Sequence, residues 1–598
     1  MIPAMSPRKH EQRGAHGAAS STHYLGTATA MAVLARGGNA FDAAVAAGFV
    51  LQVVEPHLCG PGGDLPAVFV TATDPKPKVL CAQGVAPAAA TTSLLRDELG
   101  LSIVPGTGLL APAVPGAWDG WLTLLRDHGT MTLAEVLEPA IGYAANGFPL
   151  VPRVPMTIET VAQHFAEHWP TSAQTWLLPG GEVPTTFHRL PVLAATWQRL
   201  LDVAAAAGGD RERQIDAARD AWYRGFVAEE IERFGKLPVR DETGRDHAGL
   251  LTADDLANWS ATYEDAVTAD VCDGWTVAKG GAWSQGPVLL QTLQMLRGAE
   301  VRYADGVATA ETVHLAAEAL KLAFADREAW YGDSAPVPLA TLLSPEYAAA
   351  RRALIGDTAS AELRPGSPDG LLPRLPVYAA RPDVEQATGM GGVGEPTVGP
   401  TGATRGDTVH IDVVDAAGNM ISTTPSGGWL QSSPTIPELG FCLGTRAQMF
   451  WLEDGLASSL VPGKRPRTTL SPSLALRDGE PRIAFGTPGG DQQDQWQLCF
   501  WLAHTRGGLD LQAAIDAPTW HTTSFPSSFA PRGWEPAGLV VESRLGAATL
   551  AGLRRRGHVV TDSGPYALGR LCAVGRGDGP LLHAAADQRS GVGAAAAF

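Results

Sequence analysis

The sequence predicts an α+β fold in which helices cover stacked sheets. Apolar residues recur at helical spacing over long Ala- and Leu-rich stretches of the first part of the chain, including 116–147 and 187–235. After position 408 the pattern changes to short alternating segments separated by turn residues, which is typical of strands. The chain has 598 residues, enough for a large core or two closely packed parts.

Composition excludes several classes of protein. The hydrophobic content of 45% and the charged content of 18% are typical of a globular chain. The net charge of −17 argues against nucleic acid or an anionic membrane surface as a partner. The most apolar stretch, 43–54, is too short to span a bilayer, and the N-terminus lacks the apolar region of a signal peptide. Six scattered cysteines without a CxxC pair fit a reducing cytoplasm, and we expect no metal and no organic cofactor.

The first two thirds of the chain give mainly helices. Residues 27–54 predict two helices around Gly37, Gly38 and Asn39, with Asn39 as the cap of the second. A glycine-rich turn at 59–64 leads into a strand at 67–71. Further along we expect a strand at 271–278 and helices at 286–296 and 310–331, before a long Gly/Pro-rich segment at about 365–406.

The last third gives mainly strands. Residues 408–414 and 420–424 predict two strands joined by a turn. Later segments continue the pattern, with strands expected at 473–477, 482–486, 539–542, 572–575 and 581–584, and helices at 491–504, 511–517 and 545–556.

The junction between these two regions is where we expect the chemistry. A Gly/Pro-rich run ends at Asp407 and a strand pattern begins at Thr408. Cleavage between Asp407 and Thr408 would give Thr408 a free α-amino group, which can act as the base for its own hydroxyl. The sequence therefore predicts an N-terminal threonine nucleophile. His410, two residues on, is expected on the same face of the strand as a packed or hydrogen-bonded histidine.

Three short patterns follow the junction. Ser426 belongs to a hydroxyl-rich turn behind the first two strands, and Thr468 and Thr469 lie beside a basic turn. Gly489 and Gly490 form a glycine turn that opens a helix, and its backbone N–H groups could stabilise an oxyanion.

In their order and spacing these patterns resemble the γ-glutamyltranspeptidase family of N-terminal-nucleophile hydrolases. The resemblance extends over nearly the whole chain, with matching segments at 37–46, 115–130, 326–333, 405–415, 464–472 and 486–490. It implies a four-layer αββα sandwich and a precursor that cuts itself into a large subunit, 1–407, and a small subunit, 408–598. It also implies that Thr408 forms an acyl-enzyme, Ser426 orients it, Gly489 and Gly490 bind the oxyanion, and Thr468 and Thr469 contact the substrate carboxylate.

The sequence departs from the family where the family binds glutamate. Gln83 occupies the position of the arginine that holds the substrate α-carboxylate. Trp451, aligned through Gln448 in the same substrate-binding segment, replaces the acidic residue that binds the α-ammonium, and Gly428 replaces an asparagine. Arg465, or Arg467 beside it, is a candidate for a replacement carboxylate anchor.

Four functions remain open. The first three act on a small-molecule acyl or keto-acid substrate. The first is an amide hydrolase or acyltransferase whose acyl donor is not glutathione, and the second is a standard γ-glutamyltransferase anchored by Arg465 or Arg467. The third is a carbon–carbon hydrolase acting on a keto-acid precursor in antibiotic (4-alkylproline) biosynthesis. The fourth is an inactive, uncleaved scaffold.

Overall fold

Two seven-stranded antiparallel sheets lie face to face in the computed structural model, which describes residues 10–378, 408–529 and 532–598. Sheet A runs in the order β1 (Gln12–Gly14), β22 (Leu582–Ala586), β21 (Cys572–Arg576), β17 (Glu480–Gly486), β16 (Ser473–Arg477), β11 (Trp275–Lys279) and β10 (Val267–Cys272). Sheet B runs in the order β23 (Ala594–Ala597), β2 (Gly17–Ser21), β14 (Ile411–Asp415), β15 (Met420–Thr423), β3 (Leu65–Thr71), β4 (Asp74–Ala82) and β9 (Thr262–Asp265).

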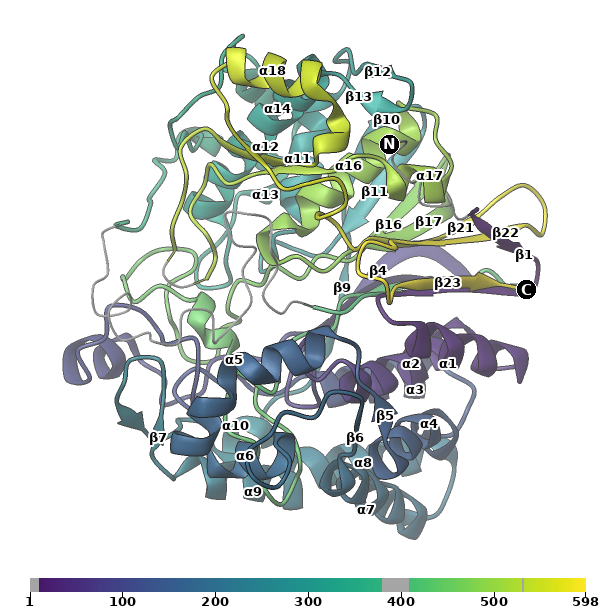
Figure 1. Ribbon diagram of the computed structural model, residues 1–598, viewed down its shortest axis with the longest axis vertical. Coiled ribbons are helices and arrows are strands. Elements are labelled where there is room, and N and C mark those ends of the chain that lie inside the picture. Colours follow the sequence, from purple (N-terminus) through teal and green to yellow (C-terminus); the bar gives the residue numbers. More distant parts are fainter. Residues whose placement is uncertain (1–9, 379–407, 530–531) are drawn as a thin grey trace.

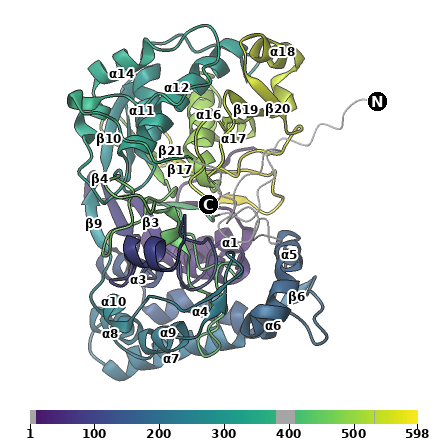
Figure 2. The same cartoon turned by 90° about the vertical axis from the view of Figure 1, so that its left-hand side faces the viewer.

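Helices cover the outer face of each sheet (Figures 1 and 2). On sheet B lie α1 (Tyr24–Ala35), α2 (Ala40–Val54) and α3 (Ala117–His128), and α4 (Leu133–Asn146), α7 (Pro191–Ala207) and α8 (Arg211–Tyr223) pack outside these helices. On sheet A lie α11 (Pro287–Leu296), α16 (Gln493–Thr505) and α17 (Leu511–Asp516), with α12 (Ala310–Trp330) packed on α11 and α18 (Ala547–Arg555) on α12. The expected four-layer αββα sandwich is confirmed.

Smaller elements surround this frame. The remaining helices are α5 (Arg153–His168), α6 (Pro170–Trp176), α9 (Phe226–Gly235), α10 (Ala253–Ala257), α13 (Leu339–Leu342) and α14 (Pro345–Arg352). The remaining strands are β5 (Phe148–Pro149), β6 (Phe187–His188), β7 (Val239–Arg240), β8 (Asp246–His247), β12 (Tyr303–Ala304), β13 (Val307–Ala308), β18 (Trp520–Thr522), β19 (Gly538–Val541) and β20 (Val559–Asp562). In the described part of the chain, no helix combines the length and the apolar character that crossing a bilayer requires.

Strand β14 lies at the centre of the molecule. Ile411 and Val413 face the core formed with the helices on sheet B, whereas Val414 packs into the apolar layer between the two sheets. A strand buried on both faces needs a nearly continuous run of apolar residues, which 411–414 supplies apart from Asp412. The segment that follows Thr408 is therefore held rigidly.

Both sheets mix strands from the two sides of position 408. In sheet B, β14, β15 and β23 follow this position, and β2, β3, β4 and β9 precede it. In sheet A, β16, β17, β21 and β22 follow it, and β1, β10 and β11 precede it. Two chains produced by a cut at this point would share both sheets and one core.

Two expectations about strands were wrong. The expected strand at 408–414 begins only at Ile411, so Thr408 lies three residues before β14. The expected single strand at 271–278 is a hairpin of β10 and β11. Its turn residues Asp273 and Gly274 have φ values of 48° and 79°, and positive φ at both positions is the requirement of a type I′ turn.

Candidate active site

The Thr408 side chain meets the Ser426 side chain beside the start of β14. Their hydroxyl oxygens lie 3.1 Å apart. The Val409 N–H donates to the Pro425 carbonyl oxygen at 3.2 Å, which holds the two segments in register. Thr408 is 3% exposed and Ser426 is 1% exposed. The structure thus brings together two hydroxyls from residues 18 positions apart in the sequence, close enough for one to orient the other.

Ser426 is fixed from its other side by Asp64. The two residues exchange backbone hydrogen bonds of 3.1 and 2.8 Å, as neighbours in an antiparallel bridge. The Asp64 carboxylate forms a bidentate pair with Arg446, with Nε–Oδ2 and Nη2–Oδ1 distances of 2.7 and 3.1 Å. Burial raises the pKa of Asp64, and the Arg446 guanidinium opposes this shift. Asp64 therefore supports Ser426 through its backbone while its charge is held by Arg446.

The loop around Asp64 approaches Ser426 so closely that only glycine fits. A Cβ built on Gly63 would lie 2.1 Å from the Ser426 carbonyl oxygen. Gly428, which follows Ser426, has φ of 69° and would carry a Cβ 2.9 Å from the Gly63 nitrogen. Gly428, where the family has an asparagine, thus belongs to a backbone contact that leaves no room for a side chain.

His410 links the segment that carries Thr408 to sheet A. Its Nδ1 lies 2.9 Å from the Thr424 hydroxyl, and its Nε2 lies 2.9 Å from the Asp412 carboxylate. The imidazole is buried against Gly486, where a Cβ would lie 2.2 Å from the ring. Gly486 ends β17, so residues 486–490, the glycine turn, begin directly beside the segment that carries Thr408.

The glycine turn opens α16 with two unusual backbone conformations. Gly489 has φ of 132° and Gly490 has φ of 53°, both in the range that favours glycine. A Cβ on Gly489 would also lie 2.6 Å from the Trp496 ring. The turn therefore lies at the end of β17 that packs against His410, two residues after Thr408.

Thr468 and Thr469 lie just before β16, in a segment held from both sides. The Thr468 N–H donates to the Trp283 carbonyl oxygen at 2.9 Å. The buried Lys279 ammonium donates to the Ser471 carbonyl oxygen at 2.9 Å. The Thr469 hydroxyl is buried and has no hydrogen-bond partner among the residues that the structure describes. Such a hydroxyl suits a polar ligand atom.

The two arginines proposed as carboxylate anchors are already paired. Arg465 contacts Glu264 at 2.5 Å and Asp333 at 2.9 Å. Arg467 contacts the buried Glu328 at 3.0 Å. A substrate carboxylate would have to displace these partners, which weakens the case for Arg465 and Arg467 as replacement anchors.

A third arginine, which the sequence analysis missed, lies against the segment 448–451 that was predicted to bind substrate. The Arg532 guanidinium carbon is 4.2 Å from the centre of the Trp451 ring. Its Nη2 donates to the carbonyl oxygens of Gln448 and Phe450 at 2.7 and 3.0 Å. A cation therefore occupies the neighbourhood in which the family has an acidic residue. Gln83, the other altered position, is buried and uncharged.

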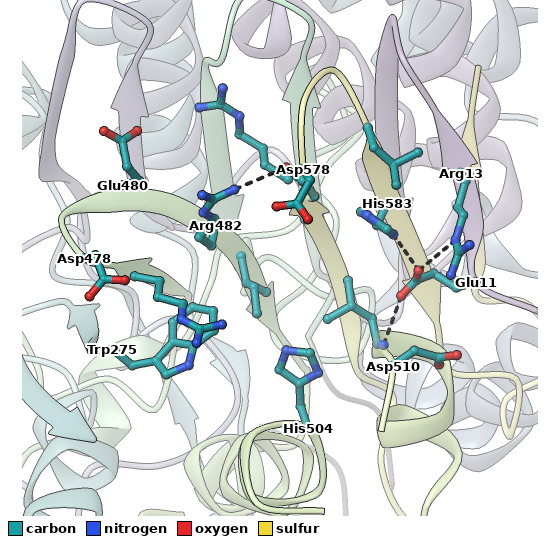
Figure 3. A pocket seen from close by; sticks show the side chains of 17 residues that line it. Glu11, Arg13, Trp275, Asp478, Glu480, Arg482, His504, Asp510, Asp578 and His583 are labelled. Carbon is teal, nitrogen blue, oxygen red and sulfur yellow. Dashed lines mark hydrogen bonds and ion pairs between the residues drawn. The ribbon is translucent and has the colours of Figure 1, made fainter. Parts of the chain in front are cut away.

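Two other features lie apart from this site. A cavity of about 690 Å³ opens at the far end of β17 from Gly486 and is lined by charged residues that include Glu11, Arg482, Asp578 and His583 (Figure 3). Its His583 and Arg13 side chains both point to the Glu11 carboxylate (Figure 3). None of the residues predicted for the active site lines this cavity.

One group of metal-ligand types comes together within the described residues. It consists of His314, Glu318 and His558, among the helices that cover sheet A. His314 Nδ1 lies 2.9 Å from His558 Nε2, and Glu318 forms an ion pair with Lys321. The two histidines therefore pair with each other and Glu318 pairs with a lysine, and we assign no metal to the group. Asp407, the residue before the expected cut, lies outside the described residues.

Comparison with known proteins identifies the family of the chain. A family model described as gamma-glutamyltranspeptidase matches residues 26–597. The chain is 30% identical over 593 residues to the acylase ACY 1 proenzyme of Pseudomonas sp. (strain SE83), covering 96% of this chain and 93% of that relative. It is 30% identical over 601 residues to the oxamate amidohydrolase proenzyme of Klebsiella pneumoniae subsp. pneumoniae, covering 98% of each.

Among solved structures, LmbA2991T421A has 56% sequence identity and a TM-score of 0.91, covering 99% of this chain and 100% of that chain. The family match spans the candidate site and every strand of the two sheets except β1 and β2. The chain is an enzyme of the γ-glutamyltranspeptidase family of N-terminal-nucleophile hydrolases.

Proposed function

We propose that this enzyme cleaves or transfers the acyl group of a small amide through an acyl-enzyme on Thr408, and that its acyl donor is not glutathione. The observation that carries the proposal is the 3.1 Å contact between the Thr408 and Ser426 hydroxyls, in a segment whose His410 packs against Gly486 at the start of the glycine turn. Acyl transfer requires an oriented nucleophile and backbone donors for the oxyanion, and we assign the donors to Gly489 and Gly490.

Maturation would use the same nucleophile. The Thr408 hydroxyl attacks the carbonyl carbon of Asp407, the peptide bond becomes an ester through an N→O acyl shift, and water hydrolyses the ester. The products are a large subunit, 1–407, and a small subunit, 408–598, with a free α-amine on Thr408. The mixed origin of both sheets supports a tight heterodimer, because neither part can bury its strands alone.

Turnover would then proceed in two steps. The Thr408 oxygen attacks the substrate carbonyl while its α-amine accepts the hydroxyl proton. The N–H groups of Gly489 and Gly490 stabilise the oxyanion, and the amine returns the proton to the leaving group. Water or an acceptor amine then releases the acyl group and regenerates Thr408.

The substrate is inferred from charge. Three positions that the family uses to hold a γ-glutamyl group carry Gln83, Trp451 and Gly428, none of which is charged. Each lost charge-assisted contact costs about 1.5–3 kcal/mol of binding, or roughly ten- to a hundred-fold in affinity. The Arg532 guanidinium near Trp451 further disfavours an α-ammonium group. We therefore propose an acyl group without an α-ammonium, as in the oxamate for which the Klebsiella relative is named.

A second candidate is hydrolysis of a carbon–carbon bond in a keto acid. The same substitutions favour it, because a keto acid presents a carboxylate and a carbonyl but no ammonium group. The oxamate of the Klebsiella relative has a carbonyl directly attached to a carboxylate, which is the same arrangement. Thr408 would attack the keto carbonyl, and a stabilised carbanion would leave in place of an amine.

We further propose that the enzyme works in the cytoplasm. All six cysteines are free, and five of them are buried. Unpaired thiols are stable in a reducing compartment.

A substrate panel tests these assignments on the processed enzyme. We expect turnover of oxamate or other simple acyl amides, with ammonia or amine released, and little turnover of glutathione or γ-glutamyl-p-nitroanilide. Release of a carboxylic acid from a keto acid without ammonia would select the carbon–carbon hydrolase. Efficient turnover of γ-glutamyl-p-nitroanilide would restore the standard γ-glutamyltransferase. Thr408→Ser, which keeps a hydroxyl, is the matched control for an inactive Thr408→Ala.

A further inference from the structure

We propose that Gln285 is a positioning residue that clamps the glycine turn in the geometry needed for oxyanion binding. The inference rests on the proposed roles of Thr408, Gly489 and Gly490. Gln285 follows β11 and precedes α11, and it is 0% exposed. It lies 205 positions before Gly490 in the sequence and belongs to none of the motifs that indicated the active site.

Gln285 contacts two parts of the candidate site at once. Its side-chain Nε2 donates to the Gly490 carbonyl oxygen at 3.1 Å. Its backbone N–H donates to the Thr468 carbonyl oxygen at 2.9 Å. One residue of the large part of the chain therefore fixes the distance between the proposed oxyanion donors and the proposed substrate hydroxyls.

The orientation of the Gln285 amide is set by Arg327. Arg327 Nη1 donates to Gln285 Oε1 at 2.9 Å. A guanidinium has no acceptor, so the oxygen of the amide must face Arg327 and the nitrogen must face Gly490. Arg327 is itself held by carboxylates on Asp491 and Glu328. The donor that reaches the turn is thus built into a buried chain of contacts.

The far side of the turn is clamped as well. Asp491, the residue after Gly490, accepts hydrogen bonds from the Ser528 N–H at 2.8 Å and the Ser528 hydroxyl at 2.7 Å. The Arg327 guanidinium contacts the Asp491 carboxylate directly. It also reaches the Gly490 carbonyl through Gln285, so one arginine holds two neighbouring groups of the turn.

Such a clamp has a physical reason. Two consecutive glycines give the backbone the positive φ values that the turn needs, but they also leave it free to rotate. Oxyanion donors lower the barrier only if they are aligned before the charge develops, since realignment would cost free energy at the transition state. Gln285 removes that freedom without touching the substrate. Its loss should lower kcat and leave KM nearly unchanged.

Gln285→Glu separates positioning from structural support. The change keeps the size of the side chain, removes the N–H that reaches Gly490, and gives Arg327 another carboxylate. We expect kcat per processed active site to fall about 10- to 100-fold, below the full loss of an oxyanion donor, with KM within about 3-fold. The difference in kcat between Gln285→Glu and the wild type should shrink as pH falls, because the introduced carboxyl group, once protonated, can again donate to the Gly490 carbonyl.

Gln294→Glu is the matched control. Gln294 lies on α11 and its Nε2 donates to the Asp270 carbonyl oxygen at 3.0 Å, so the control loses the same kind of hydrogen bond away from the turn. We expect its kcat to equal that of the wild type. Gln285→Met, which lacks both donor and charge, decides the question if Gln285→Glu does not fold.

Two outcomes overturn the inference. One is a kcat for Gln285→Glu or Gln285→Met within about 2-fold of wild type. The other is a fall in the kcat of Gln285→Glu that matches its loss of folded protein, together with a pH dependence of kcat equal to that of the wild type. Thr408→Ala measured in parallel keeps the two proposals apart. If it still turns over substrate, the proposed function fails. If it is inactive while both Gln285 variants behave as wild type, only the role of Gln285 fails.

Discussion

Replacing Ser426 by alanine should slow turnover by about 2- to 13-fold and leave the fold intact. The structure gives the size of the effect. The Ser426 hydroxyl lies 3.1 Å from the Thr408 hydroxyl, and the contact joins two neutral groups. A hydrogen bond of this kind contributes about 0.5–1.5 kcal/mol, and 1.36 kcal/mol corresponds to a tenfold change in rate. A group that transfers the proton would contribute more, about 10²- to 10⁴-fold.

The small value follows from the proposed division of labour. If the α-amine of Thr408 is the base, Ser426 only orients the nucleophile. The assay is kcat of the processed enzyme on an amide that the wild type turns over, with circular dichroism to verify the fold. Ser426→Thr keeps the hydroxyl and should retain most of the activity. A loss of more than about 100-fold in a folded Ser426→Ala enzyme would refute the reasoning and make Ser426 a proton-transfer group.

Two further predictions concern buried charge. Asp64→Asn removes the bidentate carboxylate partner of the buried Arg446 guanidinium, which should destabilise the protein by about 3–5 kcal/mol in urea unfolding. Asp265→Asn, which breaks exposed pairs with Lys76 and Lys78, should cost less than about 1 kcal/mol, and equal losses for the two variants would contradict this account. Burial raises the pKa of Glu242 from 4.5 to about 7, so the folded state keeps a proton that the unfolded chain releases in this window, and stability falls as pH rises through it. Glu242→Gln should remove about 3 kcal/mol of that fall, and identical pH slopes in unfolding experiments on the two proteins would contradict the assignment.

Most of the fold could be predicted because its signals are local. The helix from Ala310 to Trp330 and the strand from Met420 to Thr423 follow from the spacing of apolar residues within each segment. Asn39 caps α2 with a capping box, as its position before an apolar run indicates. The hairpin of β10 and β11 was missed although Asp273 and Gly274 are a strong turn signal, because the apolar run on both sides was interpreted as one strand.

The support of the candidate site could not be predicted, because it depends on residues far apart in the sequence. Ser426 is held by Asp64, and Gly490 is held by Gln285. No periodicity or local motif connects such partners. The same limit explains why Arg465 was a plausible substrate anchor from the sequence. Its pairing with Glu264 and Asp333, 201 and 132 residues away, becomes visible only in the fold.

The central claim is that Thr408 becomes an N-terminal nucleophile by self-cleavage. The most direct measurement is the intact mass of the purified protein under denaturing conditions, for the wild type and Thr408→Ala. The account predicts two polypeptides for the wild type, the smaller beginning at Thr408, and one full-length polypeptide for the variant. A wild-type protein that stays full-length after prolonged incubation, or a Thr408→Ala variant cut at the same bond, would contradict it.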